Sequence, residues 1–161
     1  LRLIVAGADK HLARYRRWAD QLGVLPRVVF LGGVKDVLPV LHAADGFVLP
    51  TLYDPFPNAV LEALACGLPT VTSRKSGAAE VITPGVNGFA PDACDVPAIA
   101  RAMAAILRAP SREAMREAAR ASVSGLSAAV LGDELLALYR ELASPVSATP
   151  LRVESTDLVQ H

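Results

Sequence analysis

The sequence predicts an α/β fold in which a parallel sheet carries helices on both faces and further helices follow it. Two observations support this prediction. In residues 1–90, short apolar runs typical of buried strands alternate with segments whose apolar residues recur at helical spacing. From Asp95 onward the chain is rich in alanine and arginine, and its periodicity is helical only.

Each expected strand is an apolar run bounded by turn residues, and the expected helix 9–23 has apolar residues that recur at helical spacing. Gly23 ends the first helix, and Pro39 limits the regularity of the second. In chain order, strands are expected at 1–5, 27–33, 46–50, 69–73 and 88–90, and helices at 9–23, 34–45, 58–66 and 78–82.

The C-terminal part is expected to contain a helical segment at 95–123, which Pro110 splits, and an amphipathic helix at 127–143. The leucine stripe of the second helix suits either core packing or a partner surface; it comprises Leu131, Leu135, Leu138 and Leu142. We therefore predict one domain over 1–143 and an irregular tail over 144–161. The sequence starts directly on a strand and without Met, so we expect a piece of a longer protein.

Composition narrows the function classes. Half of the 161 residues are hydrophobic (52%), so a sizeable core is available. Lys plus Arg (16) equals Asp plus Glu (16), which gives no general electrostatic reason for nucleic-acid binding. No apolar run approaches the ~18–20 residues of a membrane span. Only Cys66 and Cys94 occur, and we interpret them as free thiols in a reducing, cytoplasmic compartment rather than as a disulfide or metal site.

In a parallel α/β sheet, ligands bind beyond the carboxyl ends of the strands. The loops 7–10, 32–35, 50–58 and 73–79 are therefore the expected ligand loops. Arg74 and Lys75 lie in the last of these, where they are either site cations or part of a solvated loop.

Glu62 is the unusual residue of the expected helix 58–66, because its neighbours Val60, Leu61, Ala63 and Leu64 are apolar. Burying a carboxylate without a partner costs several kcal/mol. The helix shows no polar face that would place Glu62 in solvent. Either Glu62 nevertheless simply faces solvent, or its partner is a hydroxyl-bearing ligand, water in a cleft, or a donor of the protein itself, from the backbone or from Lys or Arg.

Asp54 is a second carboxylate, eight residues before Glu62. Along a helix this spacing is ~12 Å, longer than the ~5–9.5 Å between the carboxyl groups of glycoside hydrolases. The pair suits two contact points on one extended ligand, although Asp54 could instead be a helix N-cap. Pro55 and Pro57 lack N–H groups, so those of Phe56, Asn58 and Ala59 are expected to face outward as an anion site. Phosphate flanked by hydroxyl-binding carboxylates is the outline of a nucleotide-sugar site.

The stretch "DPFPNAVLEALACGLPTVTSRKSGAAEVITPGVNGFA" resembles the donor-binding segment of the retaining GT-B glycosyltransferases called glycosyl transferases group 1, or family 4. The resemblance extends over about residues 1–107 and includes "LIVAGADK" and "RVVFLGGV". The matching positions are the acidic Asp54 and Glu62, Gly67 and Pro69 of a Gly-x-Pro element, and Gly77 and Glu80 of a later Gly…Glu element.

The resemblance implies that Glu62 accepts hydrogen bonds from the nucleotide ribose and that Asp54 lies at the catalytic position beside the transferred sugar. It implies sugar transfer with retention, without a metal ion or a cofactor. It also places the basic residues that neutralise the diphosphate, and the acceptor-binding domain, upstream of Leu1. The predicted nucleotide-sugar-binding residues are Gly7, Gly32, Gly33, Val34, Phe56, Pro57, Asn58, Ala59 and Glu62.

The resulting hypothesis is the Rossmann-like C-terminal, donor-binding domain of a glycosyltransferase, with a polysaccharide or lipopolysaccharide-type acceptor. This chain alone is expected to bind the donor but not to turn it over. The alternatives are a non-catalytic binding or interaction domain that docks through the leucine stripe, and half of a nucleotide-sugar epimerase. The basic segment "DKHLARYRRW" suits either peripheral contact with the inner face of a membrane or a solvated helix face.

Overall fold

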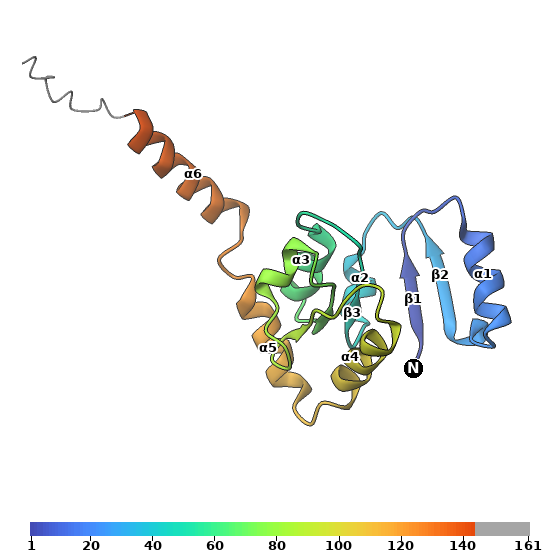
Figure 1. Cartoon of the computed structure of the whole chain (residues 1–161). Coiled ribbons are helices and arrows are strands. Elements are labelled where there is room, and N and C mark those ends of the chain that lie inside the picture. Colours follow the sequence, from blue (N-terminus) through green and yellow to red (C-terminus); the bar gives the residue numbers. More distant parts are fainter. Residues whose placement is uncertain (144–161) are drawn as a thin grey trace, which may run out of the picture. The chain divides into compact units, whose positions relative to one another are not determined.

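The computed structural model describes residues 1–143, and the chain divides into two compact units. The first unit, Leu1–Ser124, holds the strands and the first five α-helices, and the second begins at Gly125 and holds the last helix (Figure 1). The predicted tail, 144–161, lies outside the described residues.

The elements follow the predicted order. Each expected strand is present, and Pro110 lies between two helices as predicted. The segment near Ala78 is a short 3-10 helix rather than an α-helix. The elements are β1 (Leu3–Ala6), α1 (Leu12–Gln21), η1 (Leu25–Arg27), β2 (Val28–Gly32), α2 (Leu38–His42), β3 (Phe47–Val48), α3 (Asn58–Ala65), β4 (Thr70–Val71), η2 (Gly77–Val81), β5 (Gly88–Phe89), α4 (Val96–Arg108), α5 (Arg112–Ser122) and α6 (Ala128–Ala143).

All strand pairs in the ladders are parallel, as predicted, but the strands form two ladders. One contains β1 and β2, and the other has the order β3-β4-β5. Within residues 1–143 no ladder joins β1 to β3. The parallel α/β architecture is thus confirmed, with its strands divided over two sheets.

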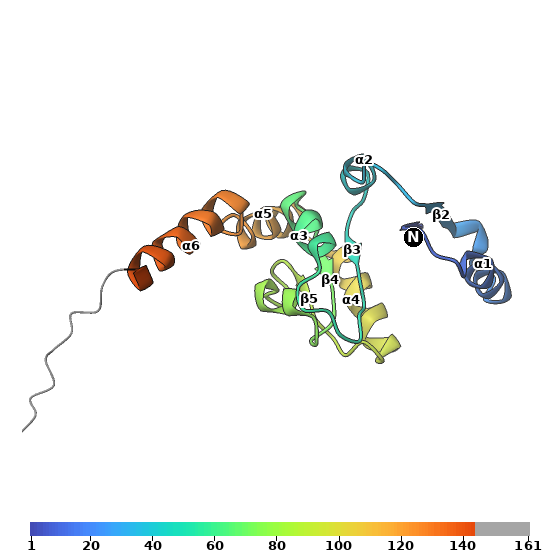
Figure 2. The same cartoon turned by 90° about the horizontal axis from the view of Figure 1, so that it is seen from above.

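The core lies around the three-stranded sheet, and helices cover both of its faces (Figure 2). Phe47 and Leu49 pack against a buried cluster of α3, η2 and α5 that contains Val60 and Leu64. The intervening residue Val48 packs against a second buried cluster, which includes Ala102 and Ile106 of α4. This alternation is what a strand produces, because successive side chains point to opposite faces.

Asn87 shapes the turn that leads into β5. Its side chain is 2% exposed, accepts a hydrogen bond from Thr83 N–H (2.7 Å) and donates one to the Val81 carbonyl (2.8 Å). The next residue, Gly88, has no room for a Cβ because the Thr70 carbonyl lies against it. The Asn-Gly pair therefore fixes the turn and permits close pairing of β5 with β4.

Helix α6 has no buried residue among those described. The four leucines of the predicted stripe are all exposed on this helix. Of the helices in this part of the chain, none has the length and apolar character needed to cross a bilayer.

Candidate functional site

Glu62 projects from the exposed side of α3. Val60, Ala63 and Leu64 point into the core, whereas Glu62 is exposed and has no ion-pair partner in residues 1–143. The interpretation that this helix lacks a face for solvent is wrong, because its outer face consists of Asn58, Ala59, Glu62 and Ala65. Because alanine is not polar, the sequence pattern did not identify this face as the exposed one. The structure removes the protein-cation alternative for Glu62 within the described chain.

Asp54 precedes the helix and organises the turn that leads to it. Its Oδ1 accepts a hydrogen bond from Phe56 N–H (3.1 Å), and its carbonyl accepts one from Gly77 N–H (2.9 Å). The N-cap of α3 is Pro57, with extended backbone. The N-cap alternative for Asp54 is therefore wrong, and so is the expectation that Phe56 N–H is free. The ~12 Å helical rise between the two carboxylates does not apply either, because Asp54 lies outside the helix.

The start of α3 retains free donors. No side chain caps it, and the backbone N–H groups of Asn58 and Ala59 have no acceptor among the described residues. Such N–H groups carry the positive end of the helix dipole. Asn58 and Glu62 are four residues apart and thus share one face of the helix. The structure therefore combines an anion-binding end with a carboxylate one turn away.

The Asp54–Phe56 turn is held by the segment that opens η2. Asp54 forms an isolated parallel bridge with Ser76, and a Cβ at Gly77 would overlap the carbonyl of Pro55. Ser76 is 3% exposed, and its hydroxyl has no partner within residues 1–143. Any side chain at position 77 would therefore clash with the backbone of Pro55, and only glycine avoids this clash.

Ser73 is a positioning residue that the sequence reasoning missed. It is 1% exposed, and its Oγ accepts a hydrogen bond from Thr51 N–H (2.7 Å). This bond ties the loop after β3 to the end of β4. A serine at the carboxyl end of a buried strand was the available signal.

The loops after β1 and β2 are joined by a backbone hydrogen bond. Gly7 N–H donates to the Gly32 carbonyl (2.7 Å), and both glycines have positive φ (138° and 70°). They line a hollow of about 200 Å³, while Gly33 and Val34 are exposed beside it. Asp54 and Glu62 do not line this hollow. A larger hollow of about 410 Å³, between β5 and α4, contains none of the predicted site residues.

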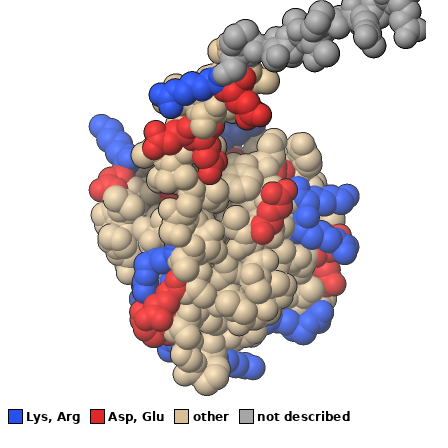
Figure 3. All heavy atoms as spheres, turned by 90° about the vertical axis from the view of Figure 1, so that its left-hand side faces the viewer, with Lys and Arg blue, Asp and Glu red and all other residues tan. Residues whose placement is uncertain are grey.

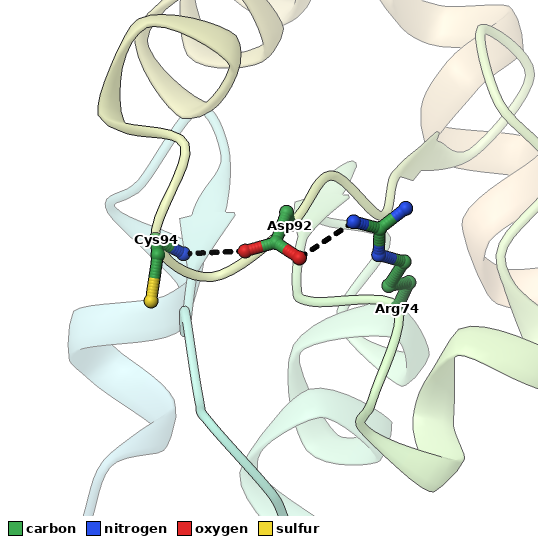
Figure 4. Close-up of polar contacts among 3 residues, drawn as sticks. All are labelled: Arg74, Asp92 and Cys94. Atoms are coloured by element: carbon green, nitrogen blue, oxygen red, sulfur yellow. Dashed lines mark hydrogen bonds and ion pairs between the residues drawn. The ribbon is translucent and has the colours of Figure 1, made fainter.

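Arg74 follows β4 and forms an ion pair with Asp92, with 2.6 Å between Nη2 and Oδ2 (Figure 4). The other oxygen of Asp92 accepts a hydrogen bond from Cys94 N–H (2.9 Å). The hydrogen bond from Arg74, followed by that from Cys94, lowers the pKa of Asp92 below its usual value. Arg74 is therefore engaged by the protein. Lys75 is exposed, and Figure 3 shows charged side chains scattered over the face that it draws.

The Arg74–Asp92 pair predicts a pH dependence of stability. Because folding lowers the pKa of Asp92, the pair contributes fully to the free energy of unfolding at neutral pH. This contribution is lost as the pH falls through the folded-state pKa of Asp92. Thermal unfolding followed from pH 7 to pH 3 should show a smaller acid-induced decrease of Tm in Asp92→Asn than in the parent protein. Asp20→Asn, on the exposed side of α1, is the matched control and should retain the parent's acid response. An Asp92→Asn profile parallel to that of the parent would contradict the role of the pair.

Comparisons with known proteins agree with this architecture. Residues 1–122 match the family described as "Glycosyl transferases group 1". The chain is 36% identical over 121 residues to a GDP-mannose-dependent alpha-(1-6)-phosphatidylinositol monomannoside mannosyltransferase of Mycolicibacterium smegmatis, covering 70% of this chain and 32% of the relative. It is 34% identical over 105 residues to the lipopolysaccharide core biosynthesis glycosyltransferase LpsE of Rhizobium meliloti, covering 65% and 31%.

The fold matches that of Anabaena Alr3699/HepE, solved in complex with UDP-glucose, with a TM-score of 0.78 at 21% identity. That match covers 87% of this chain and 41% of the other. The chain thus spans about a third of the length of the two curated relatives. On the match over residues 1–122, the chain belongs to the glycosyl transferases group 1 family.

Proposed function

We propose that the chain is the donor-binding domain of a retaining hexosyltransferase that uses a nucleotide-sugar. The observation that carries this proposal is the pairing of two free N–H groups, at Asn58 and Ala59, with the exposed carboxylate of Glu62 one helical turn away. The N–H groups suit a phosphate, and the carboxylate suits vicinal hydroxyls. A nucleotide-sugar places both kinds of group in one ligand.

Each residue then has a role. Glu62 accepts hydrogen bonds from the ribose, and the start of α3, from Pro57 to Ala59, faces the diphosphate or the sugar hydroxyls. Asp54 lies beside the transferred sugar, and its bond to Phe56 N–H fixes the direction of its carboxylate. The loop that contains Gly7 and the loop that contains Gly32, Gly33 and Val34 lie beside the base of the nucleotide.

Fixed dipoles at the start of α3 stabilise the charge that develops on the leaving diphosphate. Because these donors are part of the backbone, they need no reorganisation during the reaction. Transfer is proposed to proceed with retention at the anomeric carbon, and without a metal ion or a cofactor, as the family resemblance implies.

The acceptor is proposed to be a polysaccharide or a lipopolysaccharide-type intermediate. The names of the relatives support this, since one acts on a phosphatidylinositol mannoside and another in lipopolysaccharide core biosynthesis. Because the chain spans about a third of these relatives, the acceptor site is assigned to the remainder of a longer protein. Residues 1–161 alone are expected to bind the donor without turnover.

The proposed location is the cytoplasm, with peripheral contact at the inner face of the membrane. The exposed cations Lys10, Arg14 and Arg17 near α1 are suited to peripheral contact with anionic lipid. Part of this charge is engaged within the helix, because the Arg14 guanidinium lies 4.3 Å from the centroid of the Trp18 ring.

Calorimetric titration of the complete protein with UDP-glucose, GDP-mannose and ADP-glucose tests the proposal. One of the three should bind in preference to the others, and product analysis with a glycolipid acceptor should show the free nucleoside diphosphate. Release of an epimerised nucleotide-sugar would instead identify an epimerase. Failure of the complete, folded protein to bind any donor would support the interaction-domain alternative.

A further inference from the structure

The hollow beside the loop after β1 contains a carboxylate. This hollow lies at the carboxyl ends of β1 and β2, which run parallel and point to the same end of their ladder (Figure 1). Apolar side chains form most of its wall, among them Leu12, Tyr15 and Phe30. Among the described residues that line it, only Asp9 is charged. The hollow therefore combines a largely apolar wall with a single acidic group.

The space beside the two glycines of this hollow is open. A Cβ at Gly7 or at Gly32 would meet no described atom within 4 Å. The volume of about 200 Å³ is smaller than the roughly 300–1,000 Å³ of a site that encloses a whole drug-sized ligand. It suits one ring system of a larger ligand. A nucleobase is such a ring system, because its faces pack on apolar and aromatic side chains and its edge carries hydrogen-bonding groups.

The carboxylate of Asp9 is oriented by the backbone that leads into α1. Its Oδ1 accepts a hydrogen bond from His11 N–H at 2.6 Å. Its Oδ2 has no partner among the described residues, and Oδ1 retains a second lone pair. An ionised carboxylate accepts hydrogen bonds and donates none. Asp9 therefore presents two acceptor atoms side by side to a ligand in the hollow.

The three bases of common nucleotide-sugars differ in how they match such a pair of acceptors. The Watson–Crick edge of guanine carries two adjacent donors, N1–H and the N2 amino group, so it can bind a carboxylate through two parallel hydrogen bonds. Uracil has a single N–H group between two carbonyl oxygens, and these oxygens would lie against the negative charge. Adenine has one amino group beside an unprotonated ring nitrogen, which would also lie against it. A carboxylate at this place therefore fits guanine and disfavours uracil and adenine.

We propose that Asp9 selects a guanosine diphosphate sugar as the donor, by accepting hydrogen bonds from N1–H and the N2 amino group of guanine in this hollow. The inference rests on the proposed function, and it names the base of the nucleotide-sugar. The ring of guanine packs on the apolar wall formed by Leu12, Tyr15 and Phe30. Asp9 is then a specificity-determining residue that takes no part in the transfer itself.

Calorimetric titration of the complete protein with free GDP, UDP and ADP tests this assignment. The parent protein should bind GDP about tenfold or more tightly than UDP or ADP. Asp9→Asn should weaken GDP binding by about tenfold to a hundredfold, because the amide directs an NH₂ group toward the donors of guanine. UDP binding should not weaken. The asparagine keeps an oxygen for His11 N–H, so the midpoint of thermal unfolding should not change.

Asp20→Asn is the matched control, because it removes the same charge from the exposed side of α1 and Asp20 does not line the hollow. It should bind GDP as the parent does. A parent protein that prefers UDP or ADP would overturn the inference and leave the proposed function in place. The same conclusion would follow if Asp9→Asn bound GDP as the parent does, or lost GDP and UDP binding equally. Failure of the folded, complete protein to bind any of the three nucleotides would reject the proposed function, and the inference with it.

Discussion

Replacing Glu62 by alanine should weaken nucleotide-sugar binding by about a hundredfold and leave the fold unchanged. A carboxylate that holds ribose makes charge-assisted hydrogen bonds of roughly 1.5–3 kcal/mol each, and a loss of about 3 kcal/mol corresponds to that factor. Stability should hardly change because Glu62 is exposed and forms no ion pair within residues 1–143. The measurement is calorimetric titration of the complete protein with its preferred donor, alongside thermal unfolding.

Glu117→Ala is the matched control, since Glu117 is an exposed glutamate of α5 and the substitution removes the same charge. It should bind the donor as the parent does, which separates a local contact from a general loss of negative charge. Glu62→Gln keeps one acceptor oxygen and should fall between the parent and the alanine variant. Equal donor affinity of Glu62→Ala and the parent would disprove the ribose contact.

The order and type of the elements could be read from the sequence because they depend on local pattern. Apolar runs between turn residues indicated each strand. Helix α3 was predicted to within one residue at its C-terminal end. The strand directions followed from the alternation of strands and helices.

The division into two ladders could not be predicted, because strand pairing depends on which chain segments are available. The apolar pattern of β1 correctly indicated a strand suited to a sheet interior. Within residues 1–143, however, Leu3, Ile4 and Val5 of β1 are each at least 36% exposed. The sequence pattern thus predicted that β1 is a strand, and only the structure showed that its side chains are exposed within the described chain.

The site was predicted in part. The sequence identified Glu62 as unusual, but its alanine neighbours gave no indication of which face was outward. The bond from Asp54 to Phe56 N–H is local, and the proximity of Pro55 to Gly77 joins residues more than twenty positions apart. Periodicity carries no information on a contact of that range.

That long-range contact makes Gly77→Ala the substitution with the largest expected cost in stability. A Cβ at position 77 would overlap the carbonyl of Pro55 and press on the ring of Phe56. Backbone atoms cannot rotate away as a flexible side chain can, so either the turn or the η2 segment must move. We expect destabilisation of about 3 kcal/mol or more, the upper range for overpacking, measured by urea-induced unfolding.

The same substitution should also abolish donor binding in whatever fraction remains folded, because it breaks the bond from Gly77 N–H to the Asp54 carbonyl and displaces the start of α3. Gly132→Ala is the control: a Cβ there meets no atom within 4 Å, and alanine in a helix is favoured over glycine by about 1 kcal/mol. Gly77→Ala should therefore lower the unfolding midpoint, whereas Gly132→Ala should not. If Gly77→Ala unfolds at the parent's midpoint and binds donor equally well, the turn is not held by η2. Asp54 would then owe its position to its bond with Phe56 alone.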